Sequence, residues 1–268
     1  MATAYSLLLL VGALILPVNA VAEQFNYIIS KTAESGVPRE EAVRVAIADA
    51  FFEGIFNGSA HEKINHTMPL MRTYKAIQEQ EFNNWMILGI DTPTTDFFPQ
   101  LRDRYTQTGP LYRVRCLMVS RNEDALETLA ELPGNPLKAP PTGPIKLAIA
   151  SHPYFKRRIE EQFGSRFELT ITTSVLNAVK SLVSKRSDLV ISGDNHFDVA
   201  IHYMKKPPAA FNVSTCSNTP FFNVNLYLDV RMKPEIAAWL RERVSLLSEQ
   251  GYFDEVRLGY LKQAGFIP

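Results

Sequence analysis

The sequence lacks an excess of charge of either sign. Its 268 residues include 28 basic and 28 acidic side chains, so the formal net charge is zero. Because nucleic-acid binding needs a concentrated basic face, this balance argues against a nucleic-acid partner. Internal repeats and low-complexity segments are also missing. With 46% hydrophobic and 21% charged residues, the composition is that of a globular protein, and the length allows one large domain or two small ones.

The short motifs of common catalytic and metal sites are absent as well. The sequence has no G-x-S-x-G elbow, phosphate-binding loop, S-x-x-K or H-E-x-x-H. The histidines do not share ligand spacing, so we expect no metal site and no cofactor. Asp194 and His196 are close enough in sequence to act as an acid–base pair. No nucleophile accompanies them, and we expect a protein that is not an enzyme.

Long apolar runs are missing except near the N-terminus. Ser6 to Leu16 (SLLLLVGALIL) is too short to span a bilayer comfortably, and small residues follow it. This pattern is typical of a secretory signal peptide, with cleavage after Ala20 or Ala22. No Lys or Arg precedes the run, so an N-terminal membrane anchor is the alternative. We therefore exclude residues 1–22 from the fold and expect an exported, periplasmic protein.

Cysteine is scarce. Cys116 and Cys216 lie in strand-like runs, and their separation matches no zinc motif. An exported protein can pair two such residues, but buried free thiols fit the pattern equally well. The sequence leaves both states open.

The remaining chain alternates between strands and helices. In the first half we expect strands at 25–29, 63–69, 85–90 and 111–121, helices opened by Pro38 and Pro69, and a polar loop from Asp91 to Pro110. A stretch rich in Pro and Gly at 131–144 then reads as a linker.

A second series of strands and helices follows. We expect strands at 145–151, 166–172, 188–192 and 220–230, and helices beginning near Ser151, Ser174, Asp194 and Pro234, with a short helix at the end of the chain. The clearest helical face is Val175, Ala178, Val179, Leu182 and Val183. Alternating strands and helices favour a mostly parallel, three-layer α/β architecture.

Four stretches carry a resemblance to a known family. They are MPLMRTYKAIQEQEFNNWMILGI, TGPLYRVRCLMVSR, SVLNAVKSLVSKRSDLVISGD, and the C-terminal run from FFNVNLYLDV to VRLGY. Their order and spacing resemble the type II periplasmic solute-binding proteins, in particular family 3, the polar amino-acid-binding proteins of ABC importers. The resemblance covers most of the chain after residue 22.

The resemblance implies a fold and a function. Two lobes, each a three-layer α/β sandwich, are joined by two crossover strands; lobe 1 is expected at 23–120 plus 221–268 and lobe 2 at 121–220. A small polar ligand, amino-acid-like or an organic anion, is captured between the lobes for uptake or sensing. The implied partners are that small molecule and an ABC permease or membrane sensor, and a monomer is expected.

The resemblance also points to candidate ligand-binding residues. The family places an amine-binding acid at the end of a second-lobe strand, and Asp194 stands there, although the spacing from Asp188 is one residue longer than usual. Ser151, His152 and Ser174 lie at helix N-termini, which attract anions. Arg72 and Tyr112 are first-lobe candidates.

The usual first-lobe contacts are missing. Thr95 stands where the family has the arginine that binds a carboxylate, and Arg102 or Arg104 is the nearest substitute. An aromatic loop after the first strand is also absent.

Each candidate residue has a structural alternative. Asp194, Ser151 and Ser174 are plausible helix caps, Arg72 a solvated charge and Tyr112 a core residue. The function has alternatives too. One is a periplasmic interaction or sensor-partner protein that kept the fold and lost the pocket, and another is a dehydratase-like enzyme on the same fold.

Overall fold

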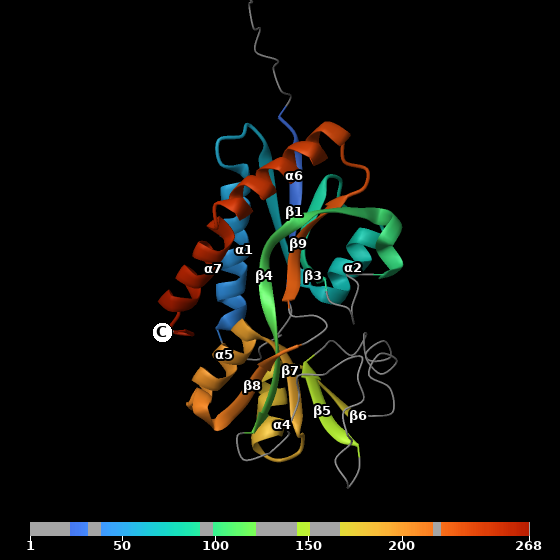
Figure 1. Cartoon of the computed structure of the whole chain (residues 1–268). Helices are drawn as coiled ribbons and strands as arrows, with labels where there is room; N and C mark the ends of the chain where they lie inside the picture. The colour runs from blue at the N-terminus through green and yellow to red at the C-terminus, as the bar shows by residue number, and fades with distance from the viewer. Residues whose placement is uncertain are drawn as a thin grey trace, which may run out of the picture.

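The computed structural model describes residues 22–31, 39–91, 99–121, 144–150, 167–216 and 221–267. Within them the chain forms two lobes connected through one sheet, whose strand order is β2-β1-β3-β9-β4-β7-β5-β6 (Figure 1). An additional strand, β8, also pairs with β4.

Lobe 1 contains β1 (Gln24–Lys31), β2 (Glu62–Pro69), β3 (Trp85–Asp91), β9 (Phe221–Asp229) and the first part of β4 (Tyr105–Arg121). Strand β1 runs parallel to β2 and β3, and β9 runs antiparallel to β3 and β4. The helices of lobe 1 are α1 (Glu40–Phe56), α2 (Leu70–Gln78), α6 (Pro234–Glu249), α7 (Tyr252–Gln263) and the short η1 (Pro99–Arg104).

Lobe 2 contains β5 (Ile145–Ala150), β6 (Phe167–Thr172), β7 (Leu189–Gly193), β8 (Phe211–Thr215) and the end of β4. Helices α4 (Val175–Val183) and α5 (Asp194–Tyr203) and the short η5 (Pro208–Ala210) complete its described part.

Apolar side chains cover both faces of the lobe 1 sheet. On one face, side chains of α1, α6 and α7 form a buried cluster that continues through Leu111 and Leu117 of β4 to α4 and α5 of lobe 2. On the other face, Ile77 of α2 and Leu101 of η1 pack with Trp85. The two lobes therefore share one apolar core on the side of α1, α6 and α7 (Figure 1).

Local sequence signals account for several helix boundaries. The predicted face of α4 is confirmed, and the Ser174 hydroxyl accepts a hydrogen bond from the Asn177 N–H at 3.2 Å. Helix α5 ends before Pro207 and Pro208, which cannot continue it. Helix α6 begins at Pro234, whose missing N–H costs nothing in a first turn.

Strand β4 passes from one lobe to the other and changes its partners on the way. Arg115 pairs with Phe221 of β9, whereas the next residue, Cys116, pairs with Gly193 of β7. From Cys116 onwards, β4 belongs to lobe 2. The division at residues 120 and 221 expected from the sequence stays a prediction.

Cys116 and Cys216 form a disulfide, which answers the question that the sequence left open. Their Cα atoms are 5.4 Å apart, and the Cys216 N–H donates to the Cys116 carbonyl at 3.0 Å. Cys116 follows directly after the first interlobe connection, and Cys216 is the last described residue before β9. The disulfide thus joins the two connections at the edge of lobe 2.

One expectation was wrong, and further predicted segments, among them the linker expected at 131–144 up to residue 143, lie outside the described residues. The polar loop predicted up to Pro110 ends earlier, since β4 begins at Tyr105 and pairs with Asp229 of β9 there. Strand β8 ends just before Cys216, where the sequence had indicated a strand-like run without bounds. The helix expected from Ser151 falls outside the described residues.

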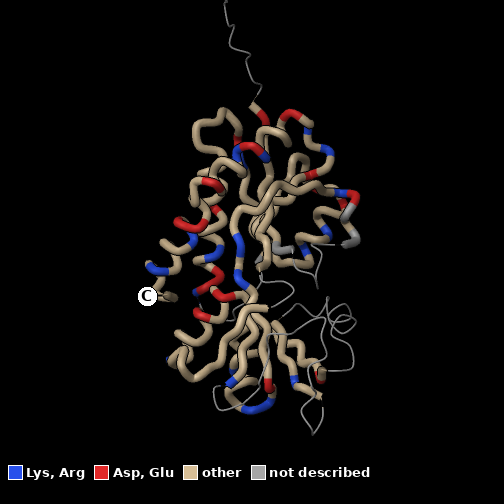
Figure 2. The backbone as a smooth tube through the Cα atoms, in the orientation of Figure 1, with Lys and Arg blue, Asp and Glu red and all other residues tan. Residues whose placement is uncertain are grey.

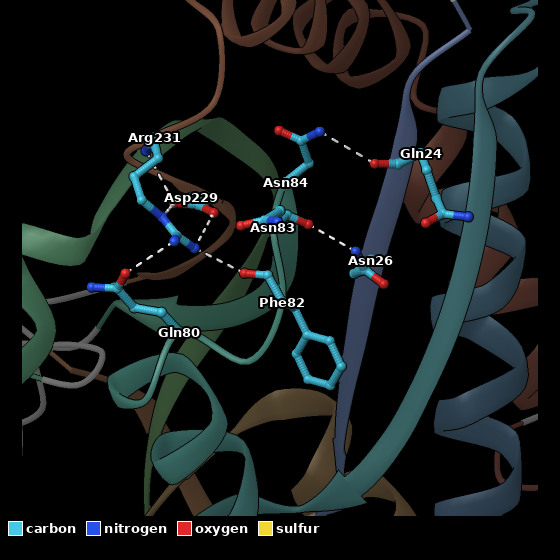
Figure 3. A network of polar contacts seen from close by, with 8 residues as sticks. All are labelled: Gln24, Asn26, Gln80, Phe82, Asn83, Asn84, Asp229 and Arg231. Carbon is cyan, nitrogen blue, oxygen red and sulfur yellow. Dashed lines mark hydrogen bonds and ion pairs between the residues drawn. The ribbon is translucent and has the colours of Figure 1, made fainter.

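A polar network fixes the turn before β3, at the amino ends of the parallel strands (Figure 3). The Arg231 guanidinium donates to both carboxylate oxygens of buried Asp229, at 3.0 and 2.9 Å, which raises the pKa of Arg231. It also donates to the Gln80 side chain at 3.0 Å and to the Phe82 carbonyl at 2.8 Å. The Asn26 amide in β1 donates to the Asn83 carbonyl at 2.7 Å.

Asp229→Asn is expected to lower the free energy of unfolding by about 2 kcal/mol, because a buried acceptor for a charged guanidinium loses its charge. Chemical denaturation measures this change. The control is Glu79→Gln, which removes an exposed carboxylate from the exposed Lys75 and should cost less than about 1 kcal/mol. Equal effects in the two variants would show that the network adds nothing beyond a surface ion pair.

Candidate ligand-binding site between the lobes

Each lobe has a topological switch point at the carboxyl ends of its parallel strands. In lobe 1, β1 lies between β2 and β3. The strand that follows β1 in the chain, β2, is on one side of it, and the next strand, β3, is on the other. In lobe 2, β5 lies between β6 and β7 in the same way. Ligands of open α/β sheets bind beyond the carboxyl ends of strands at such points.

The register of β4 shows that these two carboxyl edges face each other. Asp91, the last residue of β3, is in register with Asn223 of β9, and Asn223 is in register with Arg113 of β4. Gly193, the last residue of β7, is in register with Cys116. The edges are therefore separated only by the β4 segment from Arg113 to Cys116, roughly 10 Å at the rise of a strand. We call the space beside this segment the crevice.

Asp194 lies at the lobe 2 side of the crevice. Gly193 ends β7 and is the residue that precedes α5, so Asp194 is the first helical residue and not the cap. Its Oδ1 accepts the Asn195 N–H at 2.8 Å, and its Oδ2 lies 3.7 Å from Nε of Arg115. A carboxylate in the first turn is also stabilised by the helix dipole.

The extra residue between Asp188 and Asp194 has a structural reason at Gly193. A Cβ atom built on Gly193 would lie 2.6 Å from Cγ1 of buried Val114, so a side chain does not fit at the very end of β7. The β4–β7 register runs without a shift from Cys116 and Gly193 to Val119 and Val190. The acid is thereby placed one position further on, inside the helix and beside Arg115.

Asp198 adds a second carboxyl group one turn along α5. Its pKa lies above the usual value, first because surrounding protein atoms displace water and then because the Asp194 carboxylate is near; the Arg115 charge acts in the opposite direction. The crevice thus holds acidic groups and an arginine within reach of one another, which suits a ligand with charges of both signs.

The two interlobe strands form a short antiparallel ribbon with one open face. Cross-strand partners lie on the same face, which puts Arg113 with Asn223 and Arg115 with Phe221. Arg113 and Arg115 are exposed, and Phe221 is 47% exposed. We call these four side chains the ribbon face. Figure 2 shows basic positions along the middle of β4, between the lobes.

The sequence reasoning did not select Arg113 and Arg115. The alternating R-V-R in a predicted strand was the available signal, since it places both arginines on one side. The sequence did not show that this part of β4 pairs with β9. That pairing places the two arginines between the lobes.

The other sequence candidates of lobe 2 are only partly described. Ser174 follows β6 at its carboxyl end, is 3% exposed, and uses its hydroxyl to cap α4. Its role toward a ligand stays a prediction. Ser151 and His152 lie outside the described residues. Asp188 has a structural role at the opposite end of β7, where it accepts the Lys146 N–H at 3.0 Å.

The first-lobe candidates are held by contacts within lobe 1. Arg72 donates through both terminal nitrogens to the Glu81 carboxylate, one at 2.6 Å, and this raises the Arg72 pKa. The Tyr112 ring lies 5.8 Å from the Phe51 ring and 5.1 Å from the Arg257 guanidinium. The roles of Arg72 and Tyr112 toward a ligand stay predictions.

Of the two arginines expected to replace the missing one, Arg102 belongs to η1 and its role toward a ligand stays a prediction. The Arg104 carbonyl accepts the Val230 N–H, just after β9 ends, so Arg104 lies at the end of lobe 1 opposite the crevice. Thr95 lies outside the described residues.

Within the described ranges, no group of three or more potential metal-binding side chains is found. In the same ranges, no helix is both long and apolar enough to cross a membrane. A surface cavity of about 480 Å³ lies in lobe 1, away from the crevice, between α6 and the residues Gly109 and Pro110 of β4.

Sequence comparisons give no match to a family model or to a curated protein. Solved structures do match. An ancestral cationic amino acid solute-binding protein aligns with a TM-score of 0.56 and 12% identity, over 89% of this chain and 95% of that one. The substrate-binding protein of an amino acid ABC transporter aligns with a TM-score of 0.55 and 12% identity, over 90% of this chain and 100% of that one.

A third neighbour aligns over a similar share of the chain. The VFT2 domain of Bordetella pertussis BvgS, as a double mutant, aligns with a TM-score of 0.58 and 10% identity, over 89% of this chain and 92% of that one. At these identities the likeness concerns the fold. The chain therefore has the two-lobe fold of type II periplasmic binding proteins, as expected from the sequence.

Proposed function

We propose that this protein binds a small polar solute in the crevice between its lobes and delivers it, or reports it, to a membrane partner. The observation that carries the proposal is the register of β4, which sets the carboxyl edges of β3 and β7 opposite each other. Two switch points then meet at one place, and Asp194 and Arg115 stand there as an ion pair.

The charges at the crevice favour a particular ligand chemistry. Carboxylates of Asp194 and Asp198 suit an ammonium group, and the neighbouring arginine suits a carboxylate. A zwitterion or an organic anion with a donor group would meet both. Binding of this kind needs no chemical step, and lobe closure requires only a few backbone rotations at the connections.

The place and the partner of the protein are part of the proposal. We propose export to the periplasm after removal of residues 1–22, a monomeric state, and an ABC permease or a membrane sensor as the protein partner. The likeness of this fold to the substrate-binding protein of an amino acid ABC transporter and to a histidine kinase sensor domain supports either partner.

A thermal-shift screen of amino acids, organic acids and polyamines is expected to identify a stabilising solute. A ligand that binds the folded state at 100 times its Kd adds about 2.7 kcal/mol of stability, which corresponds to roughly 5–10 °C in Tm for a chain of this size. The chain from Glu23 to Pro268 is the sample. Absence of a shift with every solute would favour the alternative of an interaction protein without a working pocket.

Asp194→Asn is expected to weaken binding of an amine-bearing hit by about ten- to a hundredfold, because a charge-assisted hydrogen bond is lost. Isothermal titration calorimetry measures the Kd. Asp254→Asn is the matched control, since Asp254 is also in the first turn of a helix and also pairs with an arginine. An unchanged Kd for Asp194→Asn would remove this acid from the site.

A further inference from the structure

We infer that the ribbon face of Arg113, Arg115, Asn223 and Phe221 binds the acidic and planar parts of the solute, so that the ligand class is an aromatic carboxylate. Aromatic amino acids belong to this class. The inference rests on the proposed function and names the ligand chemistry of the same crevice.

The two sides of the ribbon differ sharply in their surroundings. Val114 is 4% exposed, and its cross-strand partner Phe222 packs against the lobe 2 cluster that contains Cys116. The side chains that alternate with them point the other way, and among these Arg113, Arg115 and Phe221 are exposed. Val114 and Phe222 therefore anchor the ribbon on one side, and the exposed side chains of the ribbon face lie on the other.

Arg113 and Arg115 make fewer polar contacts with the protein than Arg231 and Arg243 do. Arg113 has no hydrogen bond or ion pair within the part of the chain that the structure describes. Arg115 has the Asp194 contact, at 3.7 Å, which is longer than a hydrogen bond. By contrast, Arg231 and Arg243 each make several hydrogen bonds to protein oxygens.

The spacing of the arginines suits a single carboxylate. Two residues apart on one strand face, their Cα atoms are roughly 7 Å from each other, and long side chains can converge on one anion from there. Guanidinium groups match a carboxylate geometrically through paired N–H donors. The Asn223 side chain, beside Arg113 on the same face, offers a further donor.

Phe221 supplies the surface for a planar group. It is one of the large hydrophobic residues that stay exposed, and it stands directly across from Arg115. A ring bound against Phe221 would gain apolar contact and the offset or edge-on geometry that aromatic pairs prefer. The adjacent guanidinium can also stack on the same ring.

The position of the face completes the argument. Arg113 is in register with the carboxyl edge of lobe 1, and Arg115 contacts Asp194 at the edge of lobe 2. A carboxylate held here lies next to an acid that can accept an ammonium group. The crossover strand would thereby provide the cation that the sequence lacks at Thr95.

Titration calorimetry with chosen probes tests the ligand class. L-phenylalanine, L-tryptophan and indole-3-acetate carry both groups, phenylalaninamide lacks the carboxylate, and L-alanine lacks the ring. We expect at least one of the first three to bind, and phenylalaninamide and L-alanine to bind at least about tenfold more weakly.

Variants then locate the site. Arg113→Gln with Arg115→Gln is expected to weaken the best aromatic carboxylate by about a hundredfold, Arg113→Lys with Arg115→Lys by less, and Phe221→Ala by about tenfold. The controls are Arg186→Gln and Leu258→Ala, an exposed arginine and an exposed leucine elsewhere, with no expected change. Equal melting temperatures confirm that each variant is folded.

Two results would overturn the inference. One is an aliphatic or uncharged solute that binds more tightly than every aromatic carboxylate. The other is an aromatic carboxylate whose Kd is the same in the Arg113/Arg115 variant and the wild type. In either case solute binding by the protein would still stand, whereas the absence of any binding solute in the thermal-shift screen would contradict both proposals.

Discussion

Replacing Cys116 and Cys216 together by alanine is expected to lower the free energy of unfolding by about 4 kcal/mol. The disulfide connects positions separated by 100 residues, and a cross-link over a long loop restricts the unfolded chain most. The sites are 3% and 6% exposed, so alanine is the better replacement because serine would bury an unpaired hydroxyl.

Chemical denaturation of the oxidised wild type and the Cys116→Ala/Cys216→Ala variant measures the difference. The wild type under reducing conditions is the second comparison, and it should lose a similar amount. A loss below about 1 kcal/mol would mean that the unfolded chain gains little freedom when the bond is absent. Because the bond joins the two interlobe connections, its removal is also the most direct way to loosen the crevice without changing its charged groups.

Gly193→Asp is expected to lower the free energy of unfolding by about 3 kcal/mol, although it restores an acid at the end of β7. Gly193 has φ −74°, so an aspartate meets no backbone strain there. The cost arises because its Cβ would lie 2.6 Å from Cγ1 of Val114 and because the added carboxylate is buried.

A double-mutant cycle separates these causes. Gly193→Asp combined with Val114→Ala should regain more than about 1 kcal/mol relative to the sum of the two single changes, since the clash is then absent. Gly259→Asp, at a helical glycine with no atom near its added Cβ, is the control and should not couple with Val114→Ala. Additive effects at Gly193 would contradict the assignment of Val114 as the group that fills this position.

Elements of the fold that depend on local signals were predicted from the sequence. Helix α4 follows from its apolar periodicity and the Ser174 cap, and the start of α6 from Pro234. Strand β8 received no bounds because FNVST is short, and only Phe211 of its residues is buried. The first residues of β4 include Gly109 and Pro110, which suggest a loop, and pairing with β9 overrides that preference.

The sequence indicated some residues of the candidate site and not others. Asp194 was chosen from the family resemblance, since it follows a predicted strand, whereas its place inside α5 depends on Val114, a residue of a distant strand. The disulfide and the ribbon face both depend on how β4 pairs with strands far away in sequence, and no local pattern contains that information.

Hydrogen–deuterium exchange with a solute from the screen tests the central claim most directly. We expect slower amide exchange on both sides of the crevice, in residues 113–116, 193–198 and 221–223, because these segments would be covered by the ligand and by the closing lobes. Protection confined to the lobe 1 cavity near Gly109 and Arg241, with no change at the crevice, would contradict binding between the lobes.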